Sequence, residues 1–312
     1  MELRHLRYFL AVGEALNFTK AAAQLRVAQP ALSRQVQDLE DEIGVDLMKR
    51  GPRGITLTAE GKLFLEEARD LLQRADESVE KVRALARGEY GELHIGYAPS
   101  PTVEILPPAL TEFQIAVPGV KVLLHDLSSD ELITGLQNGA LELAIMVPPV
   151  GDQTAGILFE VLRTYPLCVA MSALHPFARM KSIPLGRLAA EPLVTLRRKD
   201  YPESHRFLDR VFASIRAKPQ IAVECDSASS LITEVEAGRG IALATSVFKL
   251  VTGKRLLYRP LTGTMEVLSV GIARATKSDV TPAGEKFCEI LRRISDGAAA
   301  TNPRAKNRSQ GM

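Results

Sequence analysis

The stretch from residue 17 to 40, NFTKAAAQLRVAQPALSRQVQDLE, contains polar side chains of the types that contact nucleic acids. Gln29, Ser33 and Arg34 recur at helical spacing, close to Pro30. Arginine can donate two hydrogen bonds to guanine, glutamine can pair with adenine, and serine can reach a base or a phosphate. A solvated helix face would show the same residue types, so the interpretation depends on the elements that position these side chains.

Short helices are expected around them. Apolar residues at helical spacing predict a first helix over residues 3–15 and a second over residues 18–25, with Asn17 as the N-cap of the second. Proline is tolerated in the first turn of a helix, so Pro30 predicts that a third helix begins at residue 28 or 29, and Gly44 ends it. Two short helices joined by a tight turn match the helix-turn-helix motif, whose second helix enters the DNA major groove.

A small hairpin, or wing, is expected after the third helix. The turn residues Gly51, Pro52 and Gly54 separate two extended runs, DLMKR and GITLT. Arg50 and Arg53 would lie at its tip, within reach of phosphate or of a narrow minor groove. The alternative is that both arginines are solvated turn residues that do not contact DNA.

A long helix is expected from Thr58 to about residue 87, since apolar residues recur along it every three or four positions. A helix of about 30 residues with a sustained apolar seam, between two folded parts, pairs with a partner helix more often than it enters a core. We therefore expect a homodimer. The seam consists of Phe64, Ala68, Leu71, Ala75, Val79 and Val82.

The stretches LRHLRYFLAVGEALNFTKAAAQLRVAQPALSRQVQDLEDEIGVDLMKR and ITLTAEG resemble the DNA-binding head of the LysR-type transcriptional regulators. The resemblance implies that Gln29, Pro30, Ser33 and Arg34 approach the major groove of promoter DNA and that Arg53 approaches the minor groove. It also implies that two dimers assemble into a homotetramer on an extended site, and it leaves RNA polymerase open as a further partner. Ala28 departs from the family, in which a capping serine or threonine is frequent, and LMKRG replaces a wing start that usually contains phenylalanine.

After the glycine-containing segment ARGEYGE, the pattern changes to alternating strands and helices. Two α/β lobes joined by crossover strands would leave a ligand cleft between them. Together with the resemblance, this predicts an α/β multidomain protein with a two-lobed, periplasmic-binding-protein-like effector domain. Its expected parts are a winged helix-turn-helix over residues 1–58, a linker and dimerisation helix over 59–88, an effector domain over 89–296 with lobe I at about 92–161 and 266–296 and lobe II at about 162–265, and a disordered tail over 297–312.

Hydroxyl groups that follow strands and precede helices are the candidate effector contacts. Hydroxyls and free N–H groups at helix starts can hold a carboxylate, so we expect the effector to be a small organic anion. An aromatic wall from the second lobe would close the cleft. Simple helix caps are the alternative for each hydroxyl. The hydroxyl candidates are Ser100, Thr102, Ser128, Ser129 and Ser227, and the wall would consist of Tyr201 and Pro202.

Composition and motif spacing disfavour other classes of protein. No run reaches the roughly 18 apolar residues of a membrane span, no export signal is evident, and a cytoplasmic protein is expected. The net charge of +2 is too small to indicate a nucleic-acid binder by itself. The five histidines and three cysteines show no metal-ligand or nucleophile spacing, so we expect no catalytic residue, no metal and no cofactor. A small-molecule carrier or sensor without a transcriptional role remains the alternative, which the fused helix-turn-helix disfavours.

Overall fold

The computed structural model describes residues 1–51, 54–98, 102–277 and 280–300. The chain divides into two compact units, Met1–Ala84 and Leu85–Met312, and each is described by itself. Among the helices in the described ranges, none is long and apolar enough to cross a membrane.

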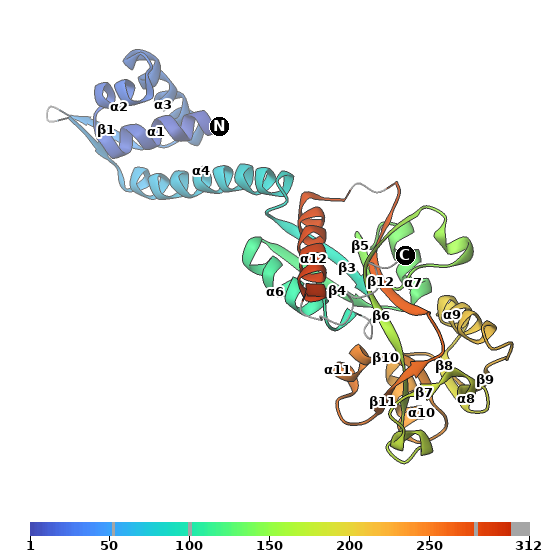
Figure 1. Ribbon diagram of the computed structural model, residues 1–312. Helices are drawn as coiled ribbons and strands as arrows, with labels where there is room; N and C mark the ends of the chain where they lie inside the picture. The colour runs from blue at the N-terminus through green and yellow to red at the C-terminus, as the bar shows by residue number, and fades with distance from the viewer. Residues whose placement is uncertain (52–53, 99–101, 278–279, 301–312) are drawn as a thin grey trace. The chain divides into compact units, whose positions relative to one another are not determined.

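The N-terminal unit is the predicted winged helix-turn-helix (Figure 1). Three helices pack around a core that includes Phe9, Leu32, Val36 and Leu39, and an antiparallel pair of strands follows them. The elements are α1 (Leu3–Ala15), α2 (Phe18–Leu25), α3 (Gln29–Ile43), β1 (Met48–Gly51), β2 (Gly54–Leu57) and α4 (Ala59–Ala86).

Local signals place these boundaries. The Asn17 side chain accepts a hydrogen bond from the backbone N–H of Lys20 at 3.0 Å and caps α2. Ala28 caps α3 without a side-chain hydrogen bond, and Gly44 ends α3 with a φ of 81°, a conformation that favours glycine. The Thr58 hydroxyl accepts from the N–H of Gly61 at 2.8 Å, as expected of the N-cap of α4.

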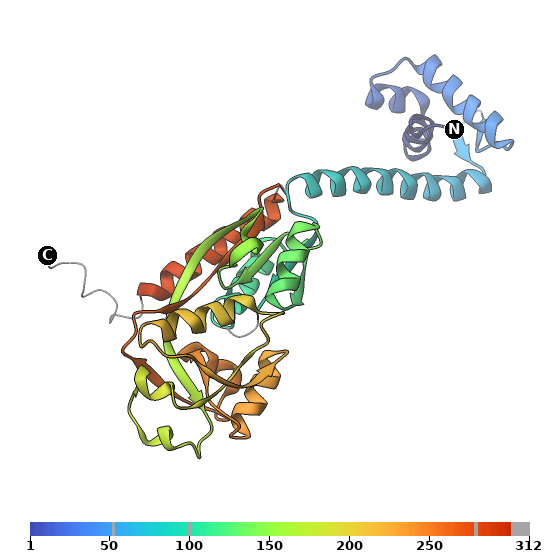
Figure 2. The same ribbon diagram turned by 90° about the vertical axis from the view of Figure 1, so that its right-hand side faces the viewer.

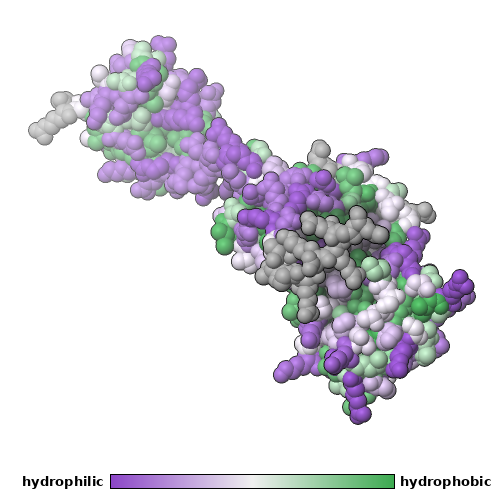
Figure 3. All heavy atoms as spheres, in the orientation of Figure 1, coloured by the Kyte–Doolittle hydropathy of each residue, from purple (hydrophilic) through white to green (hydrophobic). Residues whose placement is uncertain are grey.

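The apolar seam of α4 has two different parts. Phe64 and Ala68 pack into the core of their own unit, and the Phe64 ring lies 5.3 Å from that of Phe9, so the expectation that the whole seam faces a partner helix is wrong there. Further along, Leu71, Val79 and Val82 are 43%, 49% and 68% exposed. Exposed side chains along the face of α4 in Figure 3 are mostly hydrophilic, so these apolar residues interrupt a polar surface.

The second unit consists of two α/β lobes that share one curled sheet. In lobe I, β3 pairs in parallel with β4 and β5, and β12 runs antiparallel to β5 and β6. Its first elements are β3 (Gly91–Tyr97), α6 (Leu106–Ala116), β4 (Val120–Asp126), α7 (Ser129–Gln137), β5 (Leu143–Met146), a 3₁₀ turn (Gly151–Thr154) and β6 (Ile157–Met171). Helix α12 (Pro282–Ala300) returns to lobe I after β12 (Val267–Ala275), and Phe287 meets Phe113 of α6 edge to face at 5.3 Å.

Strand β6 continues without interruption from lobe I into lobe II (Figure 2). Its residues up to Pro166 pair with β12, and those from Leu167 onward pair with β10 and β11. A single bridge between Leu193 and Ile241 links the β8–β9 pair to this sheet. The elements of lobe II are a 3₁₀ turn (Pro176–Arg179), β7 (Ile183–Pro184), α8 (Leu185–Leu188), β8 (Pro192–Leu196), α9 (Pro202–Ala213), β9 (Gln220–Cys225), α10 (Ala228–Glu236), β10 (Ala242–Thr245), a 3₁₀ turn (Ser246–Phe248), α11 (Lys249–Thr252) and β11 (Leu257–Thr262).

The structure corrects several sequence-based boundaries. The sequence pattern predicts a helix over residues 103–114, but helix α6 begins at Leu106, because residues 103–105 form a turn and Pro107 and Pro108 occupy the first helical turn. Helix α12 extends to Ala300, although a disordered tail was expected from residue 297; the rest of that tail lies outside the described residues. Strands β7 and β11 were not predicted, because β7 has two residues and β11 contains Pro260.

Candidate nucleic-acid interface and ligand cleft

The N-terminal end of α3 presents the expected polar face. Gln29, Pro30 and Arg34 are exposed, and Ser33 is half-buried. Among the described residues, none forms an ion pair or side-chain hydrogen bond with the Arg34 guanidinium. Its N–H donors are therefore available to a partner. Buried Leu32, Val36 and Leu39 hold the opposite face of the helix against the core, so this face points outward.

Arg50 of β1 is exposed, and it also contacts this face. Its Nη2 donates to the Ser33 hydroxyl at 2.9 Å, and its guanidinium lies 5.1 Å from the centre of the Phe18 ring. Arg50 is therefore solvent-exposed, and its guanidinium also contacts Ser33 and Phe18; whether it binds DNA stays a prediction. Arg53, the second wing arginine, lies outside the described residues.

Glu40 has a structural role that the sequence analysis did not identify. It belongs to an acidic run, yet it is buried, and its Oε1 accepts hydrogen bonds from the backbone N–H groups of Leu47 and Met48 at 2.8 and 2.9 Å. These bonds connect the start of the wing to the last turn of α3. A carboxylate seven and eight residues before two N–H groups matches no local capping motif, so no sequence signal could have identified the bond.

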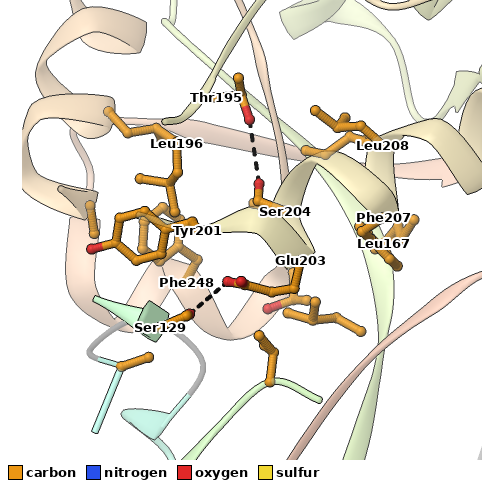
Figure 4. Close-up of a pocket in the computed structure, with 18 of the residues that line it drawn as sticks. Ser129, Leu167, Thr195, Leu196, Tyr201, Glu203, Ser204, Phe207, Leu208 and Phe248 are labelled. Carbon is orange, nitrogen blue, oxygen red and sulfur yellow. Dashed lines mark hydrogen bonds between the residues drawn. The ribbon is translucent and has the colours of Figure 1, made fainter. Parts of the chain in front are cut away.

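A cavity of about 330 Å³ lies between the two lobes of the second unit (Figure 4). Lobe I contributes Ala98, Asp126, Ser129 and the segment that follows β5 (Val147, Pro148 and Val150), and the remaining wall comes from the crossover strands and lobe II. Most of that wall is apolar, with the side chains of Leu167, Leu196, Tyr201, Phe207, Leu208 and Phe248.

Three of the predicted effector contacts line this cavity: Ser129, Tyr201 and Ser227. Pro202 begins α9 but is not part of the wall, and Ser100 lies outside the described residues. Thr102 and Ser128 do not line the cavity either.

Of the predicted effector contacts in the described part of the chain, four hydroxyls already have hydrogen-bond partners: Thr102, Ser128, Ser129 and Ser227. Thr102 is buried and donates to the Ala98 carbonyl at 2.7 Å. Ser128 forms a capping box with Glu131, donating to its carboxylate at 2.7 Å, and this bond lowers the pKa of Glu131. Ser227 caps α10 by accepting from the N–H of Ser230 at 3.2 Å. The cap interpretation therefore holds for Ser128 and Ser227, and the helix starts do not converge on one anion site.

Ser129 and Glu203 connect the two lobes across the cavity. The Ser129 hydroxyl on α7 donates to Glu203 Oε1 on α9 at 2.7 Å, and both side chains are buried (Figure 4). Burial raises the pKa of Glu203, and the hydrogen bond from Ser129 offsets part of that rise. A second interlobe bond runs from the Asp130 N–H to the Asp200 carbonyl at 3.3 Å. Glu203 was not among the predicted contacts, because in the sequence it resembles any acidic residue in the first turn of a helix.

Acidic groups dominate the electrostatics of this end of the cleft. Burial, followed by the nearby carboxylates of Asp126, Asp200, Glu131 and Glu203, raises the pKa of Tyr201 to about 12. Desolvation also raises the pKa of Asp126. The phenol of Tyr201 therefore stays protonated at neutral pH and is a hydrogen-bond donor.

The three cysteines are buried. Burial raises the pKa of Cys288 to about 12 and also raises those of Cys168 and Cys225. All three sulfurs are held in the poorly nucleophilic thiol form. Within the described ranges, no group of three or more His, Cys, Asp or Glu side chains is arranged to hold a metal ion.

Comparison with known proteins agrees with this two-part geometry. Residues 3–62 match the family described as "Bacterial regulatory helix-turn-helix protein, lysR family", and residues 86–295 match "LysR substrate binding domain". The HTH-type transcriptional regulator AlsR of Bacillus subtilis is 35% identical over 261 residues, which cover 84% of this chain and 86% of AlsR. The regulator BenM of Acinetobacter baylyi is 31% identical over 305 residues, which cover 97% of this chain and 99% of BenM.

A solved structure of full-length CbnR complexed with its target DNA is similar to this chain along its length. The TM-score is 0.78 at 30% sequence identity, and the match covers 95% of this chain and 100% of the CbnR chain.

Proposed function

As a member of the LysR family of bacterial transcriptional regulators, this chain is a DNA-binding regulator with an effector-binding domain, and we propose which residues bind DNA, partner and effector. The α3 face formed by Gln29, Pro30, Ser33 and Arg34 contacts the major groove of promoter DNA. The observation that supports this is the exposed Arg34 guanidinium, which has no partner among the described residues, at the N-terminal end of the second helix of the motif.

The wing supplies further contacts in this proposal. Arg50 donates a hydrogen bond to the Ser33 hydroxyl, so its positive charge lies beside α3, where it can reach a phosphate. Arg53 enters the minor groove, a role that depends on its sequence position alone. A regulator that binds promoter DNA works in the cytoplasm.

The exposed part of the α4 seam is the proposed dimer contact. Leu71, Val79 and Val82 expose apolar surface along one helix, and pairing with a second copy would remove that surface from water. Two such dimers on an extended promoter site would form the homotetramer.

The cavity between the lobes is the proposed effector site, with Ser129, Tyr201 and Ser227 among its contacts. An effector bound to both lobes makes different contacts in open and closed forms, and this difference in binding free energy is what changes the affinity for DNA. The organic anion expected from the sequence is disfavoured by two observations. The Ser129 hydroxyl is committed to Glu203, and Asp126 and Glu203 would repel a carboxylate.

A gel shift with DNA from upstream of the chain's own gene tests the DNA contact. Arg34→Ala should weaken binding by about 1–3 kcal/mol, which is roughly 5- to 150-fold, because a bidentate base contact is lost. Arg187→Ala removes the same charge from an exposed position in lobe II and should leave affinity unchanged. Equal affinity of the Arg34→Ala variant and the unmodified protein at fixed salt would contradict the assignment of this face. A carrier without a transcriptional role would bind none of these DNA fragments.

A further inference from the structure

Glu203 places a carboxylate where the cavity is otherwise mostly apolar. It is the second residue of α9 and is 8% exposed, and its side chain lies on the cavity wall (Figure 4). The N-terminal end of a helix favours a negative charge, so this position stabilises the carboxylate in part.

Its two oxygens have different surroundings. Oε1 accepts from the Ser129 hydroxyl at 2.7 Å. Oε2 is buried as well, and among the described residues no group donates a hydrogen bond to it. Since buried polar atoms are nearly always hydrogen-bonded, and a buried charge is costly unless paired, Oε2 is an acceptor that lacks a donor on a residue that lines the cavity.

The remaining charges do not satisfy that oxygen. Arg210 is the cation among the described lining residues, and its Nε pairs with Glu266 Oε2 at 3.3 Å while its guanidinium lies 5.4 Å from the centre of the Phe207 ring. Asp126 adds a second carboxylate to the lining. The charges of the described lining residues therefore sum to −1 when both acids are ionised, before the pairing of Arg210 is considered.

The rest of the wall has the shape and chemistry for an apolar body. Leu167, Leu196 and Leu208 provide aliphatic surface, and the rings of Tyr201 and Phe207 line the same cavity. Aromatic faces attract cations, so these rings and the carboxylates favour the same kind of ligand.

We propose that the effector of this cleft is a small apolar amine, protonated at neutral pH, whose ammonium group donates a hydrogen bond to Glu203 Oε2. The inference rests on the proposed function, because it names the class of compound that the effector cleft takes. The contact would also bear on regulation: Glu203 belongs to lobe II and is bonded to Ser129 of lobe I, so an ammonium group bound there acts on the connection between the lobes.

Isothermal titration of the full chain with three matched probes tests the proposal. The probes are 2-phenylethylamine, 2-phenylethanol and phenylacetate, which differ mainly in the charge of the polar end. The amine should bind at least tenfold more tightly than the alcohol, and phenylacetate should bind most weakly. In Glu203→Gln, the side-chain oxygen can still accept from Ser129 while the charge is gone, so the preference for the amine over the alcohol should disappear.

A control variant and a DNA assay separate the possible outcomes. Glu191→Gln removes a lobe II carboxylate that does not line the cavity, and it should keep the tenfold preference. Failure of the amine to bind, equal or tighter binding of phenylacetate, or an undiminished preference in Glu203→Gln would each overturn the proposal. If that variant does not fold, the ranking of the three probes by the unmodified protein decides alone. A parallel gel shift distinguishes this failure from failure of the proposed function, since DNA binding needs no amine.

Discussion

Replacing Glu40 by alanine should destabilise the N-terminal unit by an amount that can be worked from its two hydrogen bonds. Glu40 Oε1 accepts from the N–H groups of Leu47 and Met48, and the side chain is only 8% exposed. Hydrogen bonds to a charged group contribute roughly 1.5–3 kcal/mol each, so the pair contributes about 3–6 kcal/mol. Water can enter the space left by a truncated side chain, which favours the lower end, about 3 kcal/mol.

Hydrogen exchange measured by mass spectrometry on the segment from residue 45 to 58 provides the assay. A loss of about 3 kcal/mol should speed exchange of the Leu47 and Met48 amides by roughly 100-fold. Glu40→Gln retains an oxygen acceptor and should cost only about 1 kcal/mol, since it replaces charged bonds by neutral ones. The reasoning is refuted if alanine costs less than about 0.5 kcal/mol, or if glutamine costs as much as alanine.

Three further perturbations address the dimer, the cleft and the base of the wing. Leu71→Glu should dissociate the dimer in analytical ultracentrifugation, because it places a charge in the apolar contact. Gln73→Glu adds the same charge elsewhere on α4 and should leave the dimer intact. If the Leu71→Glu variant also remains a dimer, the contact lies elsewhere. Because burial raises the pKa of Glu203, the folded chain keeps that proton to a higher pH than the unfolded chain, so stability falls as the pH rises above about 4.3, the unfolded value. Glu203→Gln cannot ionise and should show a weaker fall in thermal unfolding temperature across that range; an identical fall would mean that Glu203 does not contribute. Gly61→Ala should cost at least about 2 kcal/mol in urea unfolding, because a Cβ there would lie 1.9 Å from the Leu47 carbonyl oxygen, and an unchanged midpoint would contradict the close approach.

The sequence by itself determined the N-terminal unit almost residue by residue. Asn17, Pro30, Gly44 and Thr58 each fix a helix end through bonds or backbone angles within four residues. Such signals are local, so they need no knowledge of the rest of the chain. The alternation of strands and helices predicted the two-lobed α/β unit for the same reason, although it missed β7 and β11.

Tertiary structure decided which apolar residues of α4 pack into a core and which polar residues contact distant parts of the chain. The seam of α4 looks uniform in the sequence, yet Phe64 and Ala68 join the N-terminal core while Val79 and Val82 remain exposed. Arg50 lies on Ser33, 17 residues earlier in the chain. Periodicity shows which side of a helix is apolar, but what covers that side depends on distant segments.

The polarity of the cleft shows most clearly that contacts between distant residues decide the chemistry of a site. Hydroxyls at helix starts predicted an anion site, because each was considered with its own helix only. In the folded chain, Ser129 meets Glu203, 74 residues away, and the start of α6 contains Pro107 and Pro108, which have no N–H to offer. The cost of a buried carboxylate depends on how far water is excluded around it, and Glu203 is buried beside Ser129 of the other lobe, which no local pattern in the sequence shows.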